Sequence, residues 1–308
     1  MSGKDVTEVV RADAAGVARA ARILESGGLV AVPTETVYGL AARADSAAAV
    51  ARIYAAKGRP SFNPLIVHVG GILQAERHAH LSPEARALAA AHWPGPLTMV
   101  LPVREDADLA EAVTAGLPTV ALRAPAHPVM QALLAALDFP LAAPSANRSG
   151  FISPTCADHV LASLDGRIDL VLDAGPTAAG VESTIVAVRP DGSLEELRPG
   201  PVQVGTRGGD KGIEAPGQLA SHYAPGKPVR LDALTAEADE FLIGFGPLPG
   251  DVTLSTRGDV TEAAARLYAA LHEAAKAPQP RIAVAPVPEE GVGIAINDRL
   301  RRAATPAD

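Results

Sequence analysis

Cysteine is almost absent from this chain of 308 residues, and Cys156, the single one, excludes an internal disulfide. Long apolar runs are also missing, since none approaches the roughly 20 residues that a membrane-spanning helix needs. The first 16 residues, MSGKDVTEVVRADAAG, lack the apolar stretch of a signal peptide. These absences predict a cytoplasmic protein without a membrane role.

The chain also lacks an excess of basic residues. Its 27 Lys and Arg residues are outnumbered by 35 Asp and Glu residues, which gives a formal net charge of -8. Neither the first 205 residues nor the remainder is basic. Proteins that hold nucleic acid by bulk electrostatics neutralise phosphates with clustered Lys and Arg. The charge therefore weighs against such a protein, and any phosphate site must be a local concentration of cations.

Several familiar motifs are missing as well. There is no GxxxxGK[ST] phosphate loop, and no GxGxxG follows a predicted strand, so neither common nucleotide-binding motif applies. No Cys/His cluster has zinc spacing, and no HExxH occurs. Metal-centred hydrolysis is therefore disfavoured.

Apolar residues are present in quantity, at 48% of the chain, but aromatic residues make up only 3%. The cores must therefore be filled by Ala, Val, Leu and Ile, which suits helices packed on a sheet. At this length a single hydrophobic core usually stops growing. The composition predicts an α/β protein with two domains.

Hydrophobic periodicity places the elements of the first domain, residues 1–205. A helix over 13–26 and a buried strand over 29–32 are followed by a helix over 47–57 that ends at Gly58, so Lys57 and Arg59 are predicted at an exposed helix exit. Further strands are predicted over 65–69, 97–103, 119–123, 140–143, 170–172, 184–188 and 194–197, with helices over 84–92, 129–137 and 157–164. The mixture predicts a mixed sheet.

The periodicity vanishes over residues 206–228, where Gly, Pro and small residues dominate. A structureless segment of this length is uncommon in a compact protein, so a functional linker is expected. Residues 229–308 are predicted to form a smaller α/β domain, with strands over 229–231, 240–245, 252–254 and 281–286 and helices over 260–275 and 293–303.

Polar residues interrupt the apolar strands or follow them. They are Thr34-Glu35-Thr36 with Tyr38, Lys57 with Arg59, Asn63 with His68, Thr119 with Arg123, Ser145 with Asn147, Ser183-Thr184, and Arg198. If the strands are neighbours in one sheet, these groups converge on one face. A pocket of cations, hydroxyls and amides is what a triphosphate and an amino acid carboxylate both require.

Six sequence blocks carry a resemblance. They read VPTETVYGLAA, AAKGRPSFNPLIVHV, TVALRAP, APSANRSGFISPT, ESTIV and LRPG, and they resemble the YrdC/Sua5 family of threonylcarbamoyl-adenylate synthases in the family's order. The later SHYAP and GVGIAINDRLRRAA look like the longer Sua5 type, which adds a C-terminal domain. The resemblance implies a YrdC-like twisted mixed sheet with flanking helices, plus a smaller C-terminal Rossmann-like α/β domain.

The resemblance also implies a reaction. The family joins L-threonine, bicarbonate and ATP into L-threonylcarbamoyl-adenylate and releases pyrophosphate. Downstream transfer proteins then modify adenosine 37 of tRNAs that read ANN codons, so direct tRNA binding is expected to be weak or indirect. Mg²⁺ is expected on the phosphates with few protein ligands. Glu35 and Glu182 stay open between magnesium binding, proton handling and plain solvation.

By resemblance, Lys57 and Arg59 are the catalytic cations on the phosphates. The implied ATP contacts are Arg59, Asn63, Thr119, Ser145, Asn147, Ser153, Arg198 and Tyr223. The implied threonine contacts are Thr36, His68, Arg123, Ala143 and Ser183. Tyr223 resembles the residue that closes over the nucleotide, which makes residues 206–228 a lid.

Ordinary structural roles are the alternative. Lys57 and Arg59 would stabilise a helix C-terminus by about 0.3–1 kcal/mol through the helix dipole. His68 would be a hydrogen-bonded core histidine, and Tyr223 a packing anchor. For the whole chain the alternatives are an RNA-binding module without catalysis, which predicts a broad basic patch, and a carbamoyl-adenylate former of the kind found in hydrogenase-maturation proteins.

Overall fold

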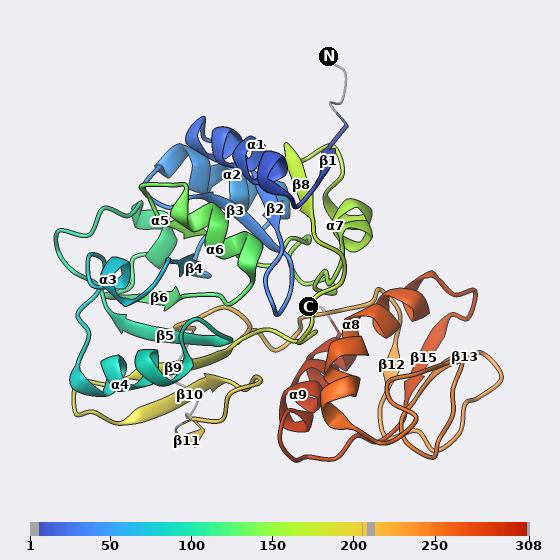
Figure 1. Cartoon of the computed structure of the whole chain (residues 1–308). Coiled ribbons are helices and arrows are strands. Elements are labelled where there is room, and N and C mark those ends of the chain that lie inside the picture. The colour runs from blue at the N-terminus through green and yellow to red at the C-terminus, as the bar shows by residue number, and fades with distance from the viewer. Residues whose placement is uncertain (1–5, 205, 208–212, 307–308) are drawn as a thin grey trace.

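The computed structural model describes residues 6–204, 206–207 and 213–306. The strands of the first sheet are β1 (Glu8–Arg11), β2 (Val30–Val32), β3 (Gly39–Arg43), β4 (Ile66–His68), β5 (Leu97–Pro102), β6 (Thr119–Arg123), β7 (Leu141–Ala142), β8 (Leu170–Asp173), β9 (Thr184–Val188), β10 (Leu194–Arg198) and β11 (Thr206–Arg207). Their spatial order is β1-β8-β2-β3-β7-β4-β6-β5-β9-β10-β11. Both parallel and antiparallel pairs occur along this order, so the sheet is mixed (Figure 1).

Helices cover both faces of the first half of the sheet and one face of the second half. They are α1 (Ala14–Glu25), α2 (Ala47–Lys57), α3 (Ile72–Ala75), α4 (Pro83–His92), α5 (Glu111–Thr114), α6 (Pro128–Ala135) and α7 (Ala157–Leu164). Because side chains alternate along a strand, Val30 and Val32 pack with α1 and α6, whereas Ala31 packs in the cluster that includes α2, α4 and α7. The first half therefore forms a three-layer sandwich.

The second half of the sheet has one face without a helix among the described residues. On this face Ile66, Ala121 and Ile185, from three different strands, pack against Ala215 of the predicted linker. The linker thus takes the place of a helical layer there. A face covered by a loop instead of a helix is a natural place for a ligand to enter.

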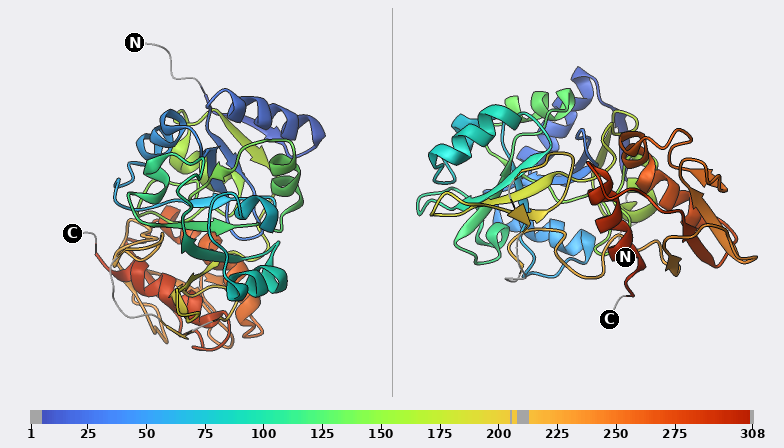
Figure 2. Two further views of the ribbon diagram at one scale, coloured as in Figure 1. Left: turned by 90° about the vertical axis from the view of Figure 1, so that its left-hand side faces the viewer. Right: turned by 90° about the horizontal axis from the view of Figure 1, so that it is seen from below.

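The smaller domain holds a parallel sheet of β12 (Val229–Arg230), β13 (Glu240–Gly244), β14 (Val252–Thr253) and β15 (Arg281–Val284), in the order β12-β15-β13-β14. Two helices, α8 (Val260–Lys276) and α9 (Gly293–Ala304), lie on the side of this sheet that faces the larger domain (Figures 1 and 2). Within the described part of the chain, no helix is long and apolar enough to cross a membrane.

The predicted fold class is confirmed: a large mixed α/β sheet with flanking helices is joined to a small parallel α/β domain. Every strand and helix predicted by residue range is present, with ends that differ by up to two residues. The prediction missed the strands β1, β3 and β11 and the short helices α3 and α5. The predicted domain boundary at residue 205 and residues 208–212 of the linker lie outside the described residues.

The two domains share one apolar cluster. Val37, Ile152 and Val181 of the larger domain pack together with the apolar faces of α8 and α9. The backbones of the two domains come close at Gly180, which has a left-handed φ of +72° and whose added Cβ would overlap the carbonyl oxygen of Ala264 in α8. Glycine is therefore required at position 180 for two reasons, conformation and space.

We expect Gly180→Ala to lower the free energy of unfolding by about 3 kcal/mol or more, because it adds a backbone clash to the left-handed penalty of about 1 kcal/mol. Gly27→Ala is the matched control: Gly27 has φ +79° but nothing within 4 Å of its added Cβ. Urea unfolding of both variants measures the difference. Equal losses in the two variants would contradict the close contact between the domains.

Candidate active site

A small cavity lies on the linker-covered face of the first sheet. Strand residues such as Ile66, His68 and Arg123 form its floor, and Pro216, Gly217, His222 and Tyr223 of the linker complete its lining. Its free volume of about 50 Å³ admits a few water molecules. These linker residues form the roof of the cavity.

Strand direction explains why polar side chains meet in the cavity. β4 and β6 are parallel and place His68 directly opposite Arg123, at their last residues. β5 runs antiparallel to β6, and β9 runs parallel to β5, so the start of β9, with Ser183 just before it, reaches the same end of the sheet. β10 then returns antiparallel to β9 and ends at Arg198. Four distant segments of sequence thus deliver polar groups to one place.

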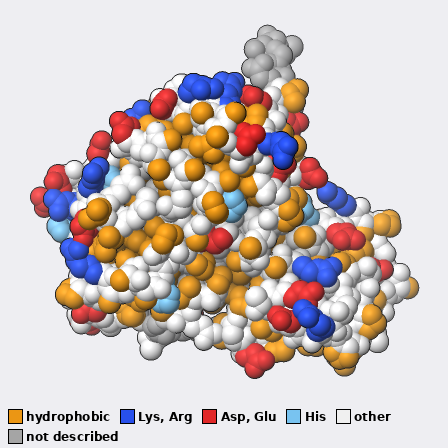
Figure 3. Space-filling view, viewed as in Figure 1, with side chains coloured by type: hydrophobic (Ala, Val, Ile, Leu, Met, Phe, Trp, Pro, Cys, Tyr) orange, Lys and Arg blue, Asp and Glu red, His pale blue; other side chains and the backbone are white. Residues whose placement is uncertain are grey.

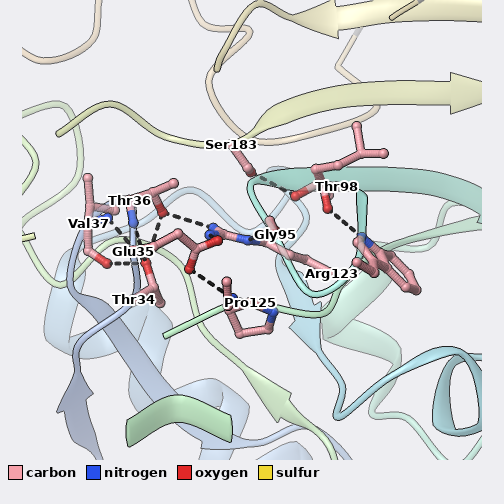
Figure 4. A network of polar contacts seen from close by, with 12 residues as sticks. Thr34, Glu35, Thr36, Val37, Gly95, Thr98, Arg123, Pro125 and Ser183 are labelled. Atoms are coloured by element: carbon pink, nitrogen blue, oxygen red, sulfur yellow. Dashed lines mark hydrogen bonds and ion pairs between the residues drawn. The ribbon is translucent and has the colours of Figure 1, made fainter. Parts of the chain in front are cut away.

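Arg123 is held in a fixed orientation by three acceptors (Figure 4). Its Nη2 donates to Glu35 Oε1 at 2.6 Å, its Nη1 to Thr36 Oγ1 at 3.0 Å, and its Nε to the Gly95 carbonyl at 3.3 Å. Thr36 itself is buried, and its hydroxyl also lies 2.9 Å from that of Thr34. The guanidinium is therefore preorganised, and its remaining N–H groups stay available for a ligand carboxylate.

Lys57 is the last residue of α2, and Arg59 lies just beyond it. Gly58, between the two, adopts a left-handed φ of 61° and turns the chain. The predicted exposed helix exit is wrong: Lys57 is only 3% exposed and Arg59 only 9%. Lys57 Nζ donates to the carbonyls of Ser145 and Asn147, and Arg59 donates to Asn63 Oδ1 at 2.7 Å. The loop of residues 145–147 contacts the buried end of Lys57, whereas the segment of Asn63 and Pro64 binds Arg59.

Lys57, Arg59 and Arg198 are three buried cations that lie near one another. Burial lowers the pKa of Lys57 well below its ordinary value and that of Arg59 to about 10, and it also lowers the pKa of Arg198. Repulsion from Arg59 adds to the effect on Lys57. Among the described residues, no ion pair of 4.0 Å or shorter includes any of the three. Such a cluster would be stabilised by an anion with several charges.

Several buried polar atoms around the cavity also lack a partner among the described residues. They are Asn63 Nδ2, His68 Nδ1, Asn147 Oδ1 and His222 Nδ1. Burial, with repulsion from Arg123, lowers the pKa of His68 to about 3, so its imidazole is neutral. Unsatisfied buried polar groups are rare in native proteins. Their concentration here indicates that a polar ligand completes the site.

The remaining predicted residues lie at varying distances from the cavity. Ala143, Ser145, Ser183, Arg198 and Tyr223 line it directly. Ser153 is fully buried and donates to Glu182 Oε1 at 2.6 Å, and Glu182 lines the cavity. Thr119 starts β6 on the same face as Arg123, about 13 Å away by strand rise. It is not part of the lining, and neither are Thr36, Lys57, Asn63, Asn147 and Ser153.

Gly217 and His222 are among the lining residues that the sequence did not single out. Gly217 approaches Arg198, since an added Cβ would lie 2.9 Å from its Cδ. His222 stacks edge-on against the ring of its neighbour Tyr223, with ring centroids 4.1 Å apart. His222 directly precedes Tyr223 in the SHYAP run. This position next to a residue predicted to contact ATP could have identified His222 from the sequence.

The carboxylates of the site already have partners. Glu35 binds Arg123, and Glu182 binds Ser153, Tyr268 and Arg299. The described residues contain no group of three or more His, Cys, Asp or Glu side chains placed to hold a metal ion. The site therefore does not fit a resident Mg²⁺, and any magnesium would arrive with a phosphate ligand.

Two family models match the sequence. The Sua5_yciO_yrdC model, described as telomere recombination, matches residues 22–200, and the model of the threonylcarbamoyl-AMP synthase C-terminal domain matches residues 192–305. The chain is 40% identical to a threonylcarbamoyl-AMP synthase of Bacillus subtilis, over 97% of this chain and 96% of that protein. It is 39% identical to a threonylcarbamoyl-AMP synthase of Pyrococcus abyssi, over 92% and 93%.

Solved structures agree with these matches. The crystal structure of P. abyssi Sua5 in complex with L-threonine has a TM-score of 0.86 and 36% identity, and the match covers 97% of both chains. A doubly substituted P. abyssi Sua5 gives a TM-score of 0.87. Both domains and their order are shared, so this chain belongs to the Sua5/YrdC family of threonylcarbamoyl-AMP synthases, in the form with a Sua5 C-terminal domain.

Proposed function

We propose that this protein joins L-threonine, bicarbonate and ATP into L-threonylcarbamoyl-adenylate and releases pyrophosphate. One observation carries the proposal: Lys57, Arg59 and Arg198 are buried together, and none of them makes an ion pair of 4.0 Å or shorter among the described residues. A triphosphate supplies the missing negative charge, and binding it would raise the lowered pKa of Lys57 again. The names of the relatives support the same reaction.

Threonine binds beside the phosphates in this proposal. Arg123 takes the α-carboxylate through the N–H groups that Glu35, Thr36 and Gly95 leave free. The neutral imidazole of His68, with its unpartnered Nδ1, and the Ser183 hydroxyl supply further contacts to the amino acid. The L-threonine complex of P. abyssi Sua5 supports an amino acid site in this fold.

The chemistry needs cations and close placement. The threonine amine attacks bicarbonate, loses water and becomes a carbamate, and a carbamate oxygen then attacks the α-phosphorus while pyrophosphate leaves. Two anions approach each other in the second step, and charge grows on the leaving group. Fixed Lys57, Arg59 and Arg198 stabilise that charge in a site from which the roof excludes water. Mg²⁺ enters as part of the ATP substrate.

The product is expected to serve threonylcarbamoylation of adenosine 37 in tRNAs that read ANN codons, in the cytoplasm, through downstream transfer proteins. An RNA-binding module is the alternative function, and it requires a broad basic surface. On the face of the molecule drawn in Figure 3, Lys and Arg lie in small separate groups interspersed with Asp and Glu. This distribution supports indirect tRNA contact and disfavours the module.

An omission experiment tests the proposed function. Pyrophosphate release is measured with ATP, bicarbonate and L-threonine together and with each one left out, and the product is identified by mass. We expect release only when all three are present. Release that is independent of threonine or bicarbonate, or salt-sensitive tRNA binding without ATP consumption, would reject the proposal.

A further inference from the structure

Arg299 is a buried cation that the proposed reaction does not use. It belongs to α9 of the smaller domain, it is 0% exposed, and it is among the largest fully buried side chains of the described residues. Its Nε donates to Glu182 Oε2 at 3.0 Å and its Nη1 to Asp298 Oδ2 at 2.7 Å, while Nη2 has no partner among the described residues. A helix of one domain therefore places its charge against a residue that lines the cavity of the other.

Glu182 is the centre of this contact. Its two oxygens accept from Ser153 Oγ at 2.6 Å, from Tyr268 at 2.8 Å and from Arg299. Burial would raise the pKa of Glu182, but Arg299, then Arg198 and the two hydroxyls, lower it to about 2. Glu182 is thus an ionised carboxylate that accepts every hydrogen bond it makes.

The smaller domain also supports the neighbouring backbone and the roof. Tyr268 and His272 are four residues apart on one face of α8, and His272 Nε2 lies 3.2 Å from the Ser153 carbonyl. The guanidinium of Arg299 lies 5.5 Å from the ring centroid of Tyr223. His222 N also donates to the carbonyl of Arg302 at 3.3 Å. Helices α8 and α9 therefore hold both sides of the cavity.

We propose that Arg299 is a positioning residue for the nucleotide, through which the C-terminal domain completes the ATP site by holding Glu182, Ser153 and Tyr223 in place. The inference rests on the proposed function, because Ser153 and Tyr223 are its predicted ATP contacts. Its physical basis is the direction of one hydrogen bond. Because Glu182 is ionised, it can only accept, and the single hydroxyl hydrogen of Ser153 points at it. Ser153 then offers the nucleotide only its lone pairs, and so accepts from a hydroxyl or amino group.

The test uses the full-length chain and compares Arg299→Met with Arg301→Met. Arg301 lies on the same helix, but it is exposed and pairs on the surface with Glu289. For Arg299→Met we expect the Kd for ATP, measured by calorimetry, to rise about tenfold or more, which is about 1.4 kcal/mol of binding free energy. The Kd for L-threonine is expected to change less than about threefold, and Arg301→Met is expected to match the unchanged protein.

Thermal unfolding and circular dichroism check the fold of each variant. A folded Arg299→Met protein that binds ATP within twofold of the unchanged protein would overturn the inference, as would equal weakening of ATP and threonine binding. Should Arg299→Met fail to fold because Glu182 is left as an unpaired buried charge, the double variant Arg299→Met/Glu182→Gln removes both charges. Weak ATP binding in the folded double variant supports the inference, and full binding refutes it.

Failure of the inference about Arg299 can be distinguished from failure of the proposed reaction. Adenylate formation is measured on the unchanged protein, whereas the role of Arg299 is read from ATP affinity in the variants. A protein that binds ATP but forms no threonylcarbamoyl-adenylate would reject the reaction and leave the Arg299 comparison intact.

Discussion

Replacing Lys57 with methionine is expected to lower the rate of adenylate formation about a thousandfold, since one fixed charge at a developing anion contributes about 3–4 kcal/mol to the transition state. Methionine keeps the length of the side chain but removes the charge and the hydrogen bonds to the Ser145 and Asn147 carbonyls. Steady-state pyrophosphate release measures the effect.

The fold should survive this substitution, for a reason that differs from the exposure predicted from the sequence. The two hydrogen bonds are lost, but the cost of burying a cation beside Arg59 is also removed, and the two effects oppose each other. Arg52→Met is the control, because Arg52 lies on the same helix α2 and pairs with Asp169 at the surface. Activity of Lys57→Met within tenfold of the control would exclude the catalytic role.

Replacing Arg123 with lysine is expected to raise the KM for L-threonine about a hundredfold with little change in the Kd for ATP. Lysine keeps the charge but lacks the rigid fork, so it cannot satisfy Glu35, Thr36 and a substrate carboxylate together. Loss of one buried charged contact of this kind costs about 2–5 kcal/mol. Initial rates at varied threonine and saturating ATP give the KM.

Arg104→Lys is the matched control for Arg123→Lys. Arg104 also binds a carboxylate through two nitrogens, that of Asp106, but at the surface, where the pair contributes little. A threonine KM for Arg123→Lys equal to that of the control would place the amino acid elsewhere. A rise in the Kd for ATP alone would assign Arg123 to the nucleotide.

Local sequence patterns predicted most of the fold because the elements carry their own signals. Ser46 caps α2 and Gly58 ends it, and the buried strands stand out as short apolar runs. β3 was missed because Gly39 and three small or apolar residues after it lack strand propensity, and its pairing with β2 and β7 is what stabilises it. Short strands of this kind depend on tertiary contacts.

The candidate site was predicted as a set of residue types but not as a geometry. The sequence indicated a cation at Lys57, yet its ammonium binds the carbonyl of Ser145, which is 88 positions away along the chain. The role of Arg299 depends on how two domains pack, and no local pattern encodes that contact. Residue identity is local information, whereas burial and pairing are properties of the folded chain.

The central claim is that threonine and the α-phosphate of ATP meet in this one cavity. Its most direct test is a reaction with bicarbonate labelled with oxygen-18, added immediately before the protein, with the adenylate analysed by fragmentation mass spectrometry. Two labelled oxygens are expected in the product, one in the carbonyl group and one bridging carbon to phosphorus. Release of pyrophosphate with no label attached to the AMP phosphorus would contradict the claim.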